Sequence, residues 1–191
     1  MDGDDLWIGT YTGGVNVLNT KTGVFRVYTT KAGDPTTLDR SSSYAIFKDR
    51  EARIWVTSMS GVNLYNREED NFTRIRDLGS WIMDIDQDAD GNIWFSSQGN
   101  GLFKYDPDKQ EWTNYVHSSA PGALINDQVN CVLIDGNGEM WIGTMNGLCK
   151  YNAKEDQFEL IPLDIPSRNI CAIIEDQRVL WLTTTKGLVR Y

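Results

Sequence analysis

The residues best suited to metal chemistry lie in one short acidic segment. Asp86, Asp88 and Asp90, followed by Gly91, match the D-x-D-x-D-G opening of a calcium-binding loop. The EF-hand version of that loop requires a bidentate acid at its twelfth position, where this chain has Ser97. The same segment also suits a tight hairpin between two strands. It is therefore a weak calcium candidate, and we expect no resident metal and no other cofactor.

The groups that could act as a catalytic base or nucleophile are few and isolated. His117 is the only histidine, and no serine–histidine–aspartate grouping can be placed around it. Cys131, Cys149 and Cys171 form no C-x-x-C pair and have no metal-ligand spacing. We expect them to be buried thiols, with a Cys131–Cys171 disulfide as the alternative in an exported protein. The sequence therefore offers no catalytic residues, and we expect a protein that is not an enzyme.

Charge and composition exclude several classes of partner. The 191 residues include 18 Lys and Arg against 27 Asp and Glu, a formal net charge of −9, which disfavours binding to nucleic acid or to anionic membranes. No apolar run approaches the roughly 18–20 residues of a membrane helix. The acidic start Met-Asp-Gly-Asp-Asp also lacks the apolar region of a signal peptide. We expect a globular chain without direct membrane contact.

Five of the seven tryptophans mark an internal repeat. Most copies share a carboxylate six residues before the tryptophan, and downstream a glycine followed by an aliphatic residue, a tyrosine and a further aromatic residue. Periods of roughly 40–50 residues that contain several short β-type segments are typical of β-propeller blades. The repeated tryptophans, which stand 48, 39, 47 and 40 residues apart, are Trp7, Trp55, Trp94, Trp141 and Trp181, and the carboxylates are Asp49, Asp88, Asp135 and Glu175.

Each repeat is predicted to form four short antiparallel strands. The segments are rich in β-branched and aromatic residues, are bounded by turn formers, and show no sustained helical periodicity. We therefore predict an all-β fold: a β-propeller arc of about four and a half blades, a fragment of a larger, seven-bladed ring. The first copy lacks its first strand and the last copy lacks its fourth. The repeats of this single propeller segment (1–191) are predicted at residues 1–30, 40–76, 80–116, 125–162 and 165–191.

The connections that join one blade to the next differ most in length. From the aromatic residue of the fourth strand to the next carboxylate the distances are 24, 16, 23 and 17 residues. Variable loops on a rigid scaffold usually carry recognition, and an aromatic ring beside amides suits a sugar ring. For each single residue, solvation of a surface loop is the alternative. The predicted ligand contacts are Arg40, Trp81, Gln98, Asn100, Asn126, Asp127, Asn146, Arg168 and Lys186, with Tyr11, Met59 and Met145 as further loop residues on the same face.

The repeat resembles that of a known family. The segments DGNGEMWIGTMNGLCKYN (135–152) and ADGNIWFSSQGNGLFKYDP (89–107) are similar to the two-component regulator propeller repeat, and the resemblance covers nearly the whole chain. It implies the periplasmic or extracellular sensor part of a hybrid two-component system that detects a glycan or related small molecule and regulates polysaccharide utilisation. Kinase activity would then reside outside this chain. The partners implied are that ligand, the remaining blades of the parent protein and, through open blade faces, a homo-oligomer.

Two other functions remain open from the sequence. Many propellers are protein–protein interaction scaffolds, and nothing in the repeat distinguishes a scaffold from a sensor. The string DGNIWF is also similar to repeats of streptogramin-lyase propellers, whose catalysis needs a histidine and acids on one face together with a metal. A single histidine in 191 residues does not supply that set.

Overall fold

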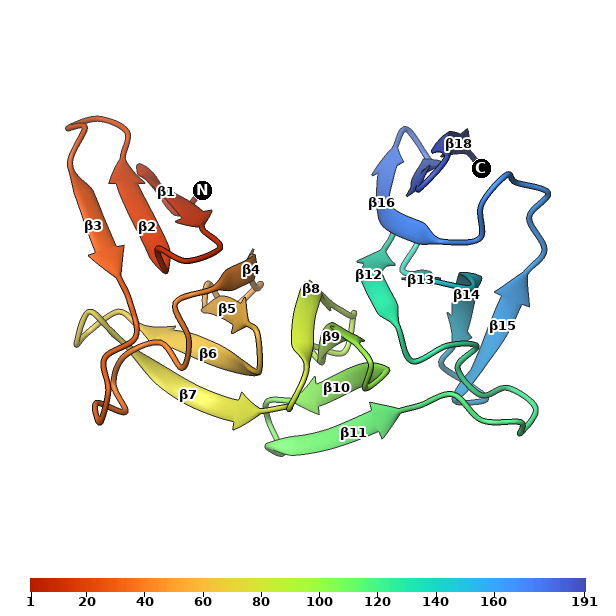
Figure 1. Ribbon diagram of the computed structural model, residues 1–191, viewed down its shortest axis with the longest axis horizontal. Coiled ribbons are helices and arrows are strands. Elements are labelled where there is room, and N and C mark those ends of the chain that lie inside the picture. The colour runs from red at the N-terminus through yellow and green to blue at the C-terminus, as the bar shows by residue number, and fades with distance from the viewer. The chain divides into compact units, whose positions relative to one another are not determined.

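The computed structural model describes residues 1–191 as eighteen strands and no helix (Figure 1). The first sheet contains β1 (Asp5–Gly9), β2 (Val15–Asn19) and β3 (Phe25–Tyr28). The second contains β4 (Ser43–Lys48), β5 (Ile54–Ser58), β6 (Gly61–Asn66) and β7 (Asn71–Asp77). The third contains β8 (Trp81–Gln87), β9 (Ile93–Gln98), β10 (Leu102–Asp106) and β11 (Glu111–Tyr115). The fourth contains β12 (Val129–Ile134), β13 (Met140–Thr144), β14 (Gly147–Asn152) and β15 (Gln157–Ile161). The fifth contains β16 (Ile170–Asp176), β17 (Val179–Thr184) and β18 (Gly187–Arg190).

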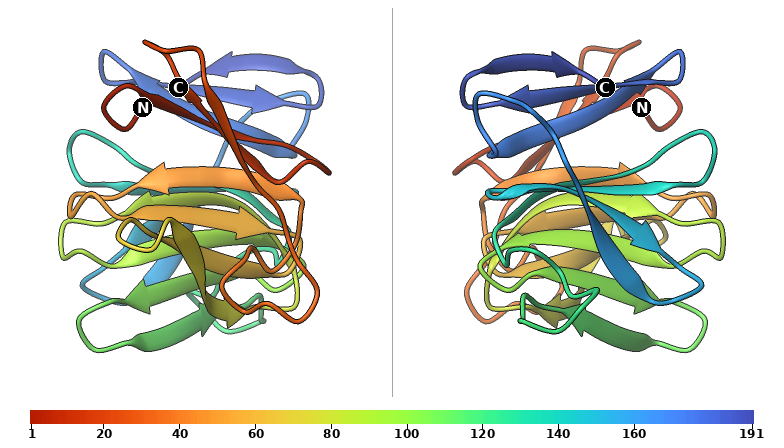
Figure 2. Two further views of the ribbon diagram at one scale, coloured as in Figure 1. Left: turned by 90° about the vertical axis from the view of Figure 1, so that its left-hand side faces the viewer. Right: turned by 90° about the vertical axis from the view of Figure 1, so that its right-hand side faces the viewer.

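Every sheet is an antiparallel meander in which neighbours in sequence are neighbours in the sheet. This confirms the all-β prediction, including eighteen strands with three in the first sheet and three in the last. The repeat boundaries and the seven-bladed ring stay predictions. The chain forms two compact units, residues 1–82 and 83–191, and within each unit neighbouring sheets lie face to face (Figure 2). No helix is long and apolar enough to cross a membrane.

The tryptophans pack between neighbouring sheets of a unit, as the repeat predicts. In three cases the indole ring of one sheet meets the tyrosine ring of the next sheet edge to face. Aliphatic side chains fill the space around these rings, so each interface is a separate apolar core. Burial of such large rings is the main favourable contribution to sheet stacking. The centroid distances are 4.8 Å for Trp7 and Tyr65, 5.1 Å for Trp94 and Tyr151, and 5.7 Å for Trp141 and Tyr191.

The recurring carboxylate holds the tryptophan in place. In three sheets the indole N–H donates to the carboxylate that lies six residues earlier. The other carboxylate oxygen accepts the backbone N–H of the residue four positions later, which closes the hairpin between the first and second strands. One carboxylate thus accepts hydrogen bonds from both the backbone N–H of the turn and the N–H of the indole ring. The indole bonds are Trp55–Asp49 at 2.7 Å, Trp94–Asp88 at 2.8 Å and Trp141–Asp135 at 2.9 Å.

The first and fifth copies do not share this arrangement. Met1 stands six residues before Trp7, and the indole N–H of Trp7 is buried without a partner. In the fifth copy the hairpin has only two residues, Gln177 and Arg178, with φ of 50° and 66°, as in a type I′ turn. Because this turn is shorter, Glu175 lies within β16, and its Oε2 accepts the backbone N–H of Gly136, 2.7 Å away in the preceding sheet.

The shorter turn of the fifth copy moves β16 by one residue relative to β17, and this corrects one expectation about the cysteines. Cys131 and Cys149 are buried thiols, as predicted, but Cys171 is exposed. Cys131 pairs with Gly143 across the sheet, and in β16 the equivalent position is occupied by Ala172. An equal distance from tryptophan therefore does not give Cys131 and Cys171 equal positions. All three thiols are free, so the alternative disulfide is not formed.

A second hydrogen-bonded cluster links the sheets in pairs. Asp70 accepts the hydroxyls of Tyr28 and Tyr65, which come from adjacent sheets. Asp156 in the same way accepts Tyr115 at 2.7 Å and Tyr151 at 2.5 Å. We call this arrangement the tyrosine clamp. In the other two copies the first tyrosine is replaced by Ile75 or Ile161, which have no hydroxyl, so the clamp alternates along the chain.

The two long connections lie at the same sheet junctions as the two clamps and are anchored at both ends. Leu38 and Leu124 insert equivalent side chains into the cores beneath them. In the second of these connections the N–H of Phe158 donates to Gly122 O at 2.7 Å, and the N–H of Gly101 donates to Asp127 O at 3.0 Å. Gly101 has φ of +76°, and a Cβ there would lie 2.1 Å from Tyr115 O. The alternation of long and short connections thus repeats every two blades, and the long connections are held against the blades by these hydrogen bonds.

Apolar side chains are exposed on one face of the first and last sheets. On β3, Phe25 and Val27 are open to solvent, and on the last sheet Ile174 and Leu188 are open. Exposed apolar surface of this kind often marks a contact site. That further blades or a second copy cover these faces stays a prediction.

Substitution of the indole-binding carboxylate should destabilise the protein. Asp88→Ala leaves the buried indole N–H of Trp94 and the hairpin N–H of Asn92 without their acceptor, so we expect a loss of about 2 kcal/mol in unfolding free energy. Chemical denaturation followed by tryptophan fluorescence measures this loss. Asp90→Ala, an exposed change in the same hairpin, is the matched control and should cost less than about 0.5 kcal/mol. Equal losses in the two variants would contradict the assigned role of Asp88.

Candidate functional site

Three exposed or half-buried aromatic rings form a row in the first unit. Tyr11 lies in the β1–β2 turn, Tyr44 in β4 and Trp81 at the start of β8. Trp81 stacks on Tyr44 with 5.9 Å between centroids and 17° between planes, and Tyr11 meets Tyr44 edge-on at 6.4 Å. Tyr11 is 66% exposed and Trp81 43% exposed. We call these residues the aromatic row; it offers solvent an open ring surface.

Tyr44 was not among the residues predicted from the sequence. Its hydroxyl is buried and has no hydrogen-bond partner. The spacing of the repeat indicates its position. Tyr44 stands eleven residues before Trp55, as Asn130 stands eleven residues before Trp141, so both are placed near the start of the first strand of a sheet. Arg40, which was predicted, has an exposed side chain whose Nη1 donates to Asp39 O at 3.3 Å.

In the second unit, amide side chains of β9, of β12 and of the residue just before β16 form a ladder. Gln98 Nε2 donates to Asn130 Oδ1 at 3.4 Å, and Asn130 Nδ2 donates to Asn169 Oδ1 at 2.9 Å. Asn130 also donates to Ile170 O at 2.8 Å. Gln98 was predicted as a ligand contact, whereas its two partners were missed. We call these three residues the amide ladder. Each amide carries both donors and acceptors.

Other predicted contacts hold loops in shape. Asn126 Oδ1 accepts the N–H of Gln128 at 2.7 Å, and Asp127 Oδ1 accepts the N–H of His117 at 2.6 Å. Asn100 lies in the β9–β10 turn, where its N–H donates to Ser97 Oγ at 3.2 Å. Lys186 lies in the exposed β17–β18 turn. As ligand contacts, these residues stay predictions.

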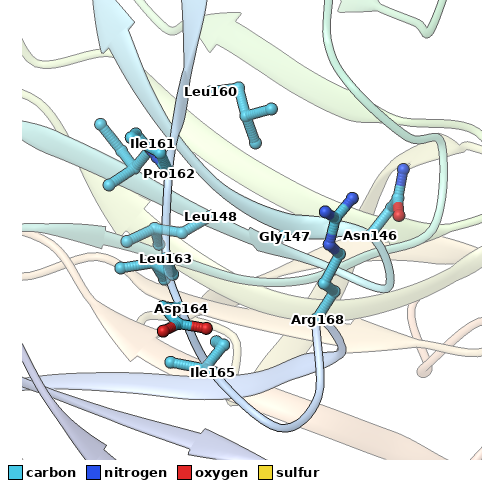
Figure 3. Close-up of a pocket in the computed structure, with 10 residues that line it drawn as sticks. All are labelled: Asn146, Gly147, Leu148, Leu160, Ile161, Pro162, Leu163, Asp164, Ile165 and Arg168. Atoms are coloured by element: carbon cyan, nitrogen blue, oxygen red, sulfur yellow. The ribbon is translucent and has the colours of Figure 1, made fainter.

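Two predicted residues come together at a cavity of about 410 Å³ in the second unit (Figure 3). Asn146, from the β13–β14 turn, and Arg168, from the β15–β16 connection, lie on one side of it. Asp164 lies on the opposite side in the same view. The cavity lies against β14, β15 and the connection that follows β15. Its apolar lining is formed by Leu148, Leu160, Ile161, Pro162, Leu163 and Ile165.

The side chains of the acidic segment, at the end of β8 and in the β8–β9 turn, bond to protein groups. Asp88 receives the indole of Trp94, and Asp86 Oδ2 accepts the N–H of Ile134 at 2.6 Å. The N–H of Asp90 donates to Asp88 Oδ1 at 3.0 Å. No group of three His, Cys, Asp or Glu side chains lies close enough to hold a metal ion. The geometry gives the calcium candidate Asp86, Asp88 and Asp90 no support.

Asp84 has the most unusual electrostatic environment in this segment. Its Oδ2 accepts the N–H of Val132 at 3.2 Å, at the edge of β12 that faces away from β13. Burial raises the pKa of Asp84 to about 6, and the charge of Asp86 adds to this rise, while the backbone N–H groups of Val132 and Ile85 oppose it. Burial and the charge of Asp84 together raise the pKa of the Cys131 thiol. Asp84 thus links two sheets in a way that depends on pH.

The single histidine also has a structural partner. His117 Nδ1 lies 2.8 Å from Leu124 O, across the long connection between the third and fourth sheets. Together with the bond from the His117 backbone N–H to Asp127, this contact ties the two ends of the connection together.

Comparison with known proteins places these sheets in a family. Residues 123–146, which span Leu124, β12, β13 and the turn with Asn146, match the two-component regulator propeller. The chain contains two-component regulator propeller repeats. Over 157 residues the repeats are 30% identical to histidine kinase P4 of Formosa agariphila, a match that covers 77% of this chain and 11% of that protein.

Solved structures show the same fold. The repeats superpose with a TM-score of 0.83 on the extracellular domain of a putative hybrid two-component system from B. thetaiotaomicron, at 24% identity, over 98% of this chain and 25% of that one. Virginiamycin B lyase from Staphylococcus aureus gives a TM-score of 0.74 at 13% identity, over 98% of this chain and 66% of that one. These likenesses establish β-propeller blades. The chain spans about a quarter of the length of the sensor domain it matches.

Asp84 should make stability depend on pH in a defined direction. A carboxyl whose pKa is raised on folding contributes stability that is complete below its unfolded pKa near 4 and is lost as pH rises through about 6. The asparagine of Asp84→Asn cannot ionise. The unfolding free energy of the variant minus that of the unmodified chain should therefore rise by about 2 kcal/mol between pH 4 and pH 7.5.

Urea unfolding at a series of pH values measures this difference. Asp90→Asn removes an exposed carboxylate of the neighbouring hairpin and should give a nearly flat difference over the same range. A flat difference for Asp84→Asn as well would show that Asp84 ionises as it does in the unfolded chain.

Proposed function

We propose that this chain is a ligand-sensing segment of the extracytoplasmic part of a two-component sensor, and that its ligand is a glycan. The two-component regulator propeller repeat and the likeness to an extracellular domain of a hybrid two-component system support the sensor assignment. Regulation of polysaccharide utilisation is the corresponding role for the whole protein. Kinase activity would belong to parts of that protein outside these residues.

The observation that carries the glycan proposal is the aromatic row. Tyrosine and tryptophan rings are apolar on their faces and polar at one edge, which matches a sugar ring with an apolar C–H face and hydroxyls at its rim. Trp81 presents such a face, and its stacking on Tyr44 holds the ring in one orientation. A pre-oriented ring loses little conformational entropy when a ligand binds.

The amide ladder supports the same ligand class in the second unit. A sugar hydroxyl can donate and accept hydrogen bonds, and so can a carboxamide. One amide can therefore either donate to a hydroxyl or accept from it. Gln98 and Asn130 are only partly buried and can exchange bonds within the ladder for bonds to a ligand. Such an exchange changes the links between successive sheets.

Signalling follows from differential binding. A ligand shifts a conformational equilibrium only if it binds one state better than the other. Because the amide ladder links three sheets, a ligand that replaces its bonds favours one packing of these sheets. We propose that this bias is passed to the parts of the sensor that carry the output, and that the segment itself performs no chemistry.

Oligosaccharide binding tests the proposal. The chain is titrated calorimetrically with neutral hexasaccharides of arabinose, xylose, galactose, mannose, glucose and fructose. We expect at least one to bind, and Trp81→Ala to weaken that binding about tenfold through loss of the stacking face.

Phe25→Ala is the matched control, because Phe25 is also an exposed aromatic residue and lies on β3, away from the aromatic row. It should leave the affinity unchanged. Absence of binding for all six sugars would overturn the glycan proposal and favour a protein-interaction scaffold. An equal loss in both variants would remove the aromatic row as the site.

A further inference from the structure

The cavity beside Arg168 has a pre-formed apolar wall. Leu148 is completely buried, and Ile161, Leu163 and Ile165 pack against the core between the fourth and fifth sheets. Leu160, from the outer strand β15, is 51% exposed and stands at the mouth. Because these side chains are held by the core, the wall exists before any ligand arrives. A volume of about 410 Å³ is within the usual range of small-molecule sites.

The rim of this cavity is polar and asymmetric. Arg168 takes part in no ion pair, so its guanidinium is available to a ligand. The side chain of Asn146 lies beside it and supplies an N–H donor (Figure 3). Asp164, also outside any ion pair, stands across the cavity from Arg168. One end of the cavity therefore attracts an anion and the other repels it.

The lining differs from that of the aromatic row. It contains five aliphatic side chains and a proline, and no aromatic ring on which a sugar could stack. An aliphatic wall favours an apolar ligand body through burial of surface. The planar guanidinium of Arg168 favours a carboxylate, which it can bind through two parallel hydrogen bonds.

We propose that this cavity is a second ligand site, and that it binds a small carboxylate with an aliphatic body. The aliphatic body lies against Leu148, Leu163 and Ile165. The carboxylate lies at the Arg168 end, where Asn146 donates to it, and Asp164 prevents the reversed orientation by repulsion. The site is independent of the glycan proposal, because it shares no residue with the aromatic row or the amide ladder.

Three probes with one body and different head groups test the proposal. Cyclohexanecarboxylate, cyclohexanecarboxamide and cyclohexylmethylammonium are titrated into the ¹⁵N-labelled chain, and shifts of the backbone signals of Asn146–Leu148 and Leu160–Ile165 are followed. We expect the carboxylate to bind about fivefold more tightly than the amide, and the ammonium to bind most weakly.

Two variants should change carboxylate binding in opposite directions. Arg168→Gln should weaken it about fivefold without affecting the amide, and Asp164→Asn should strengthen it about twofold. Arg178→Gln removes a positive charge from the β16–β17 turn and serves as the control for net charge. It should leave all three affinities unchanged.

Several results would overturn the proposal. Equal affinities of the three probes would mean that the wall alone binds them. Equal effects of Arg168→Gln and Arg178→Gln would mean that only net charge matters. Trp81→Ala should leave the affinities of all three probes unchanged. If the carboxylate binds and no oligosaccharide does, only the glycan proposal is overturned.

Discussion

The hydrogen bond from a tryptophan indole to the carboxylate six residues earlier organises most of this structure. Asp49, Asp88 and Asp135 each accept an indole N–H with one oxygen and close a hairpin with the other. The hairpin fixes where the first strand of a sheet ends and the second begins, and the indole bond fixes which ring faces the next sheet. Local turn chemistry and packing between sheets are therefore controlled by one side chain. Where the acceptor is absent, as at Trp7, the indole N–H stays buried and unsatisfied.

On top of this single-blade repeat the chain has a period of two blades. The tyrosine clamps at Asp70 and Asp156 recur together with the long connections that insert Leu38 and Leu124. The clamp fastens the outer strand of one sheet to the third strand of the next, and the connection covers their junction. No clamp lies at the short connections. One of them, between β15 and β16, contains Arg168 and forms part of the apolar wall of the cavity. Similar blades thus carry different surface features: an aromatic row, an amide ladder and a cavity.

Much of the fold could be predicted from the sequence, because tryptophan spacing and turn residues are local signals. The blade count, the all-β class and the buried Cys131 follow from them. Equal spacing misled where one turn is shorter: Glu175 lies in a strand and Cys171 is exposed. The site was only partly predictable. Trp81, Asn146 and Arg168 stood out by type and position, whereas the wall around Leu163 depends on a loop conformation and on packing that no periodic pattern encodes.

Hydrogen exchange of the tryptophan side chains tests the central role of the indole–carboxylate bond most directly. A ¹⁵N-resolved exchange series reports each of the seven indole N–H groups separately. The account predicts that Trp55, Trp94 and Trp141 exchange about 100-fold more slowly than Trp81, because their N–H groups are both buried and bonded to carboxylates. Exchange of these three indoles at the rate of Trp81 would contradict it.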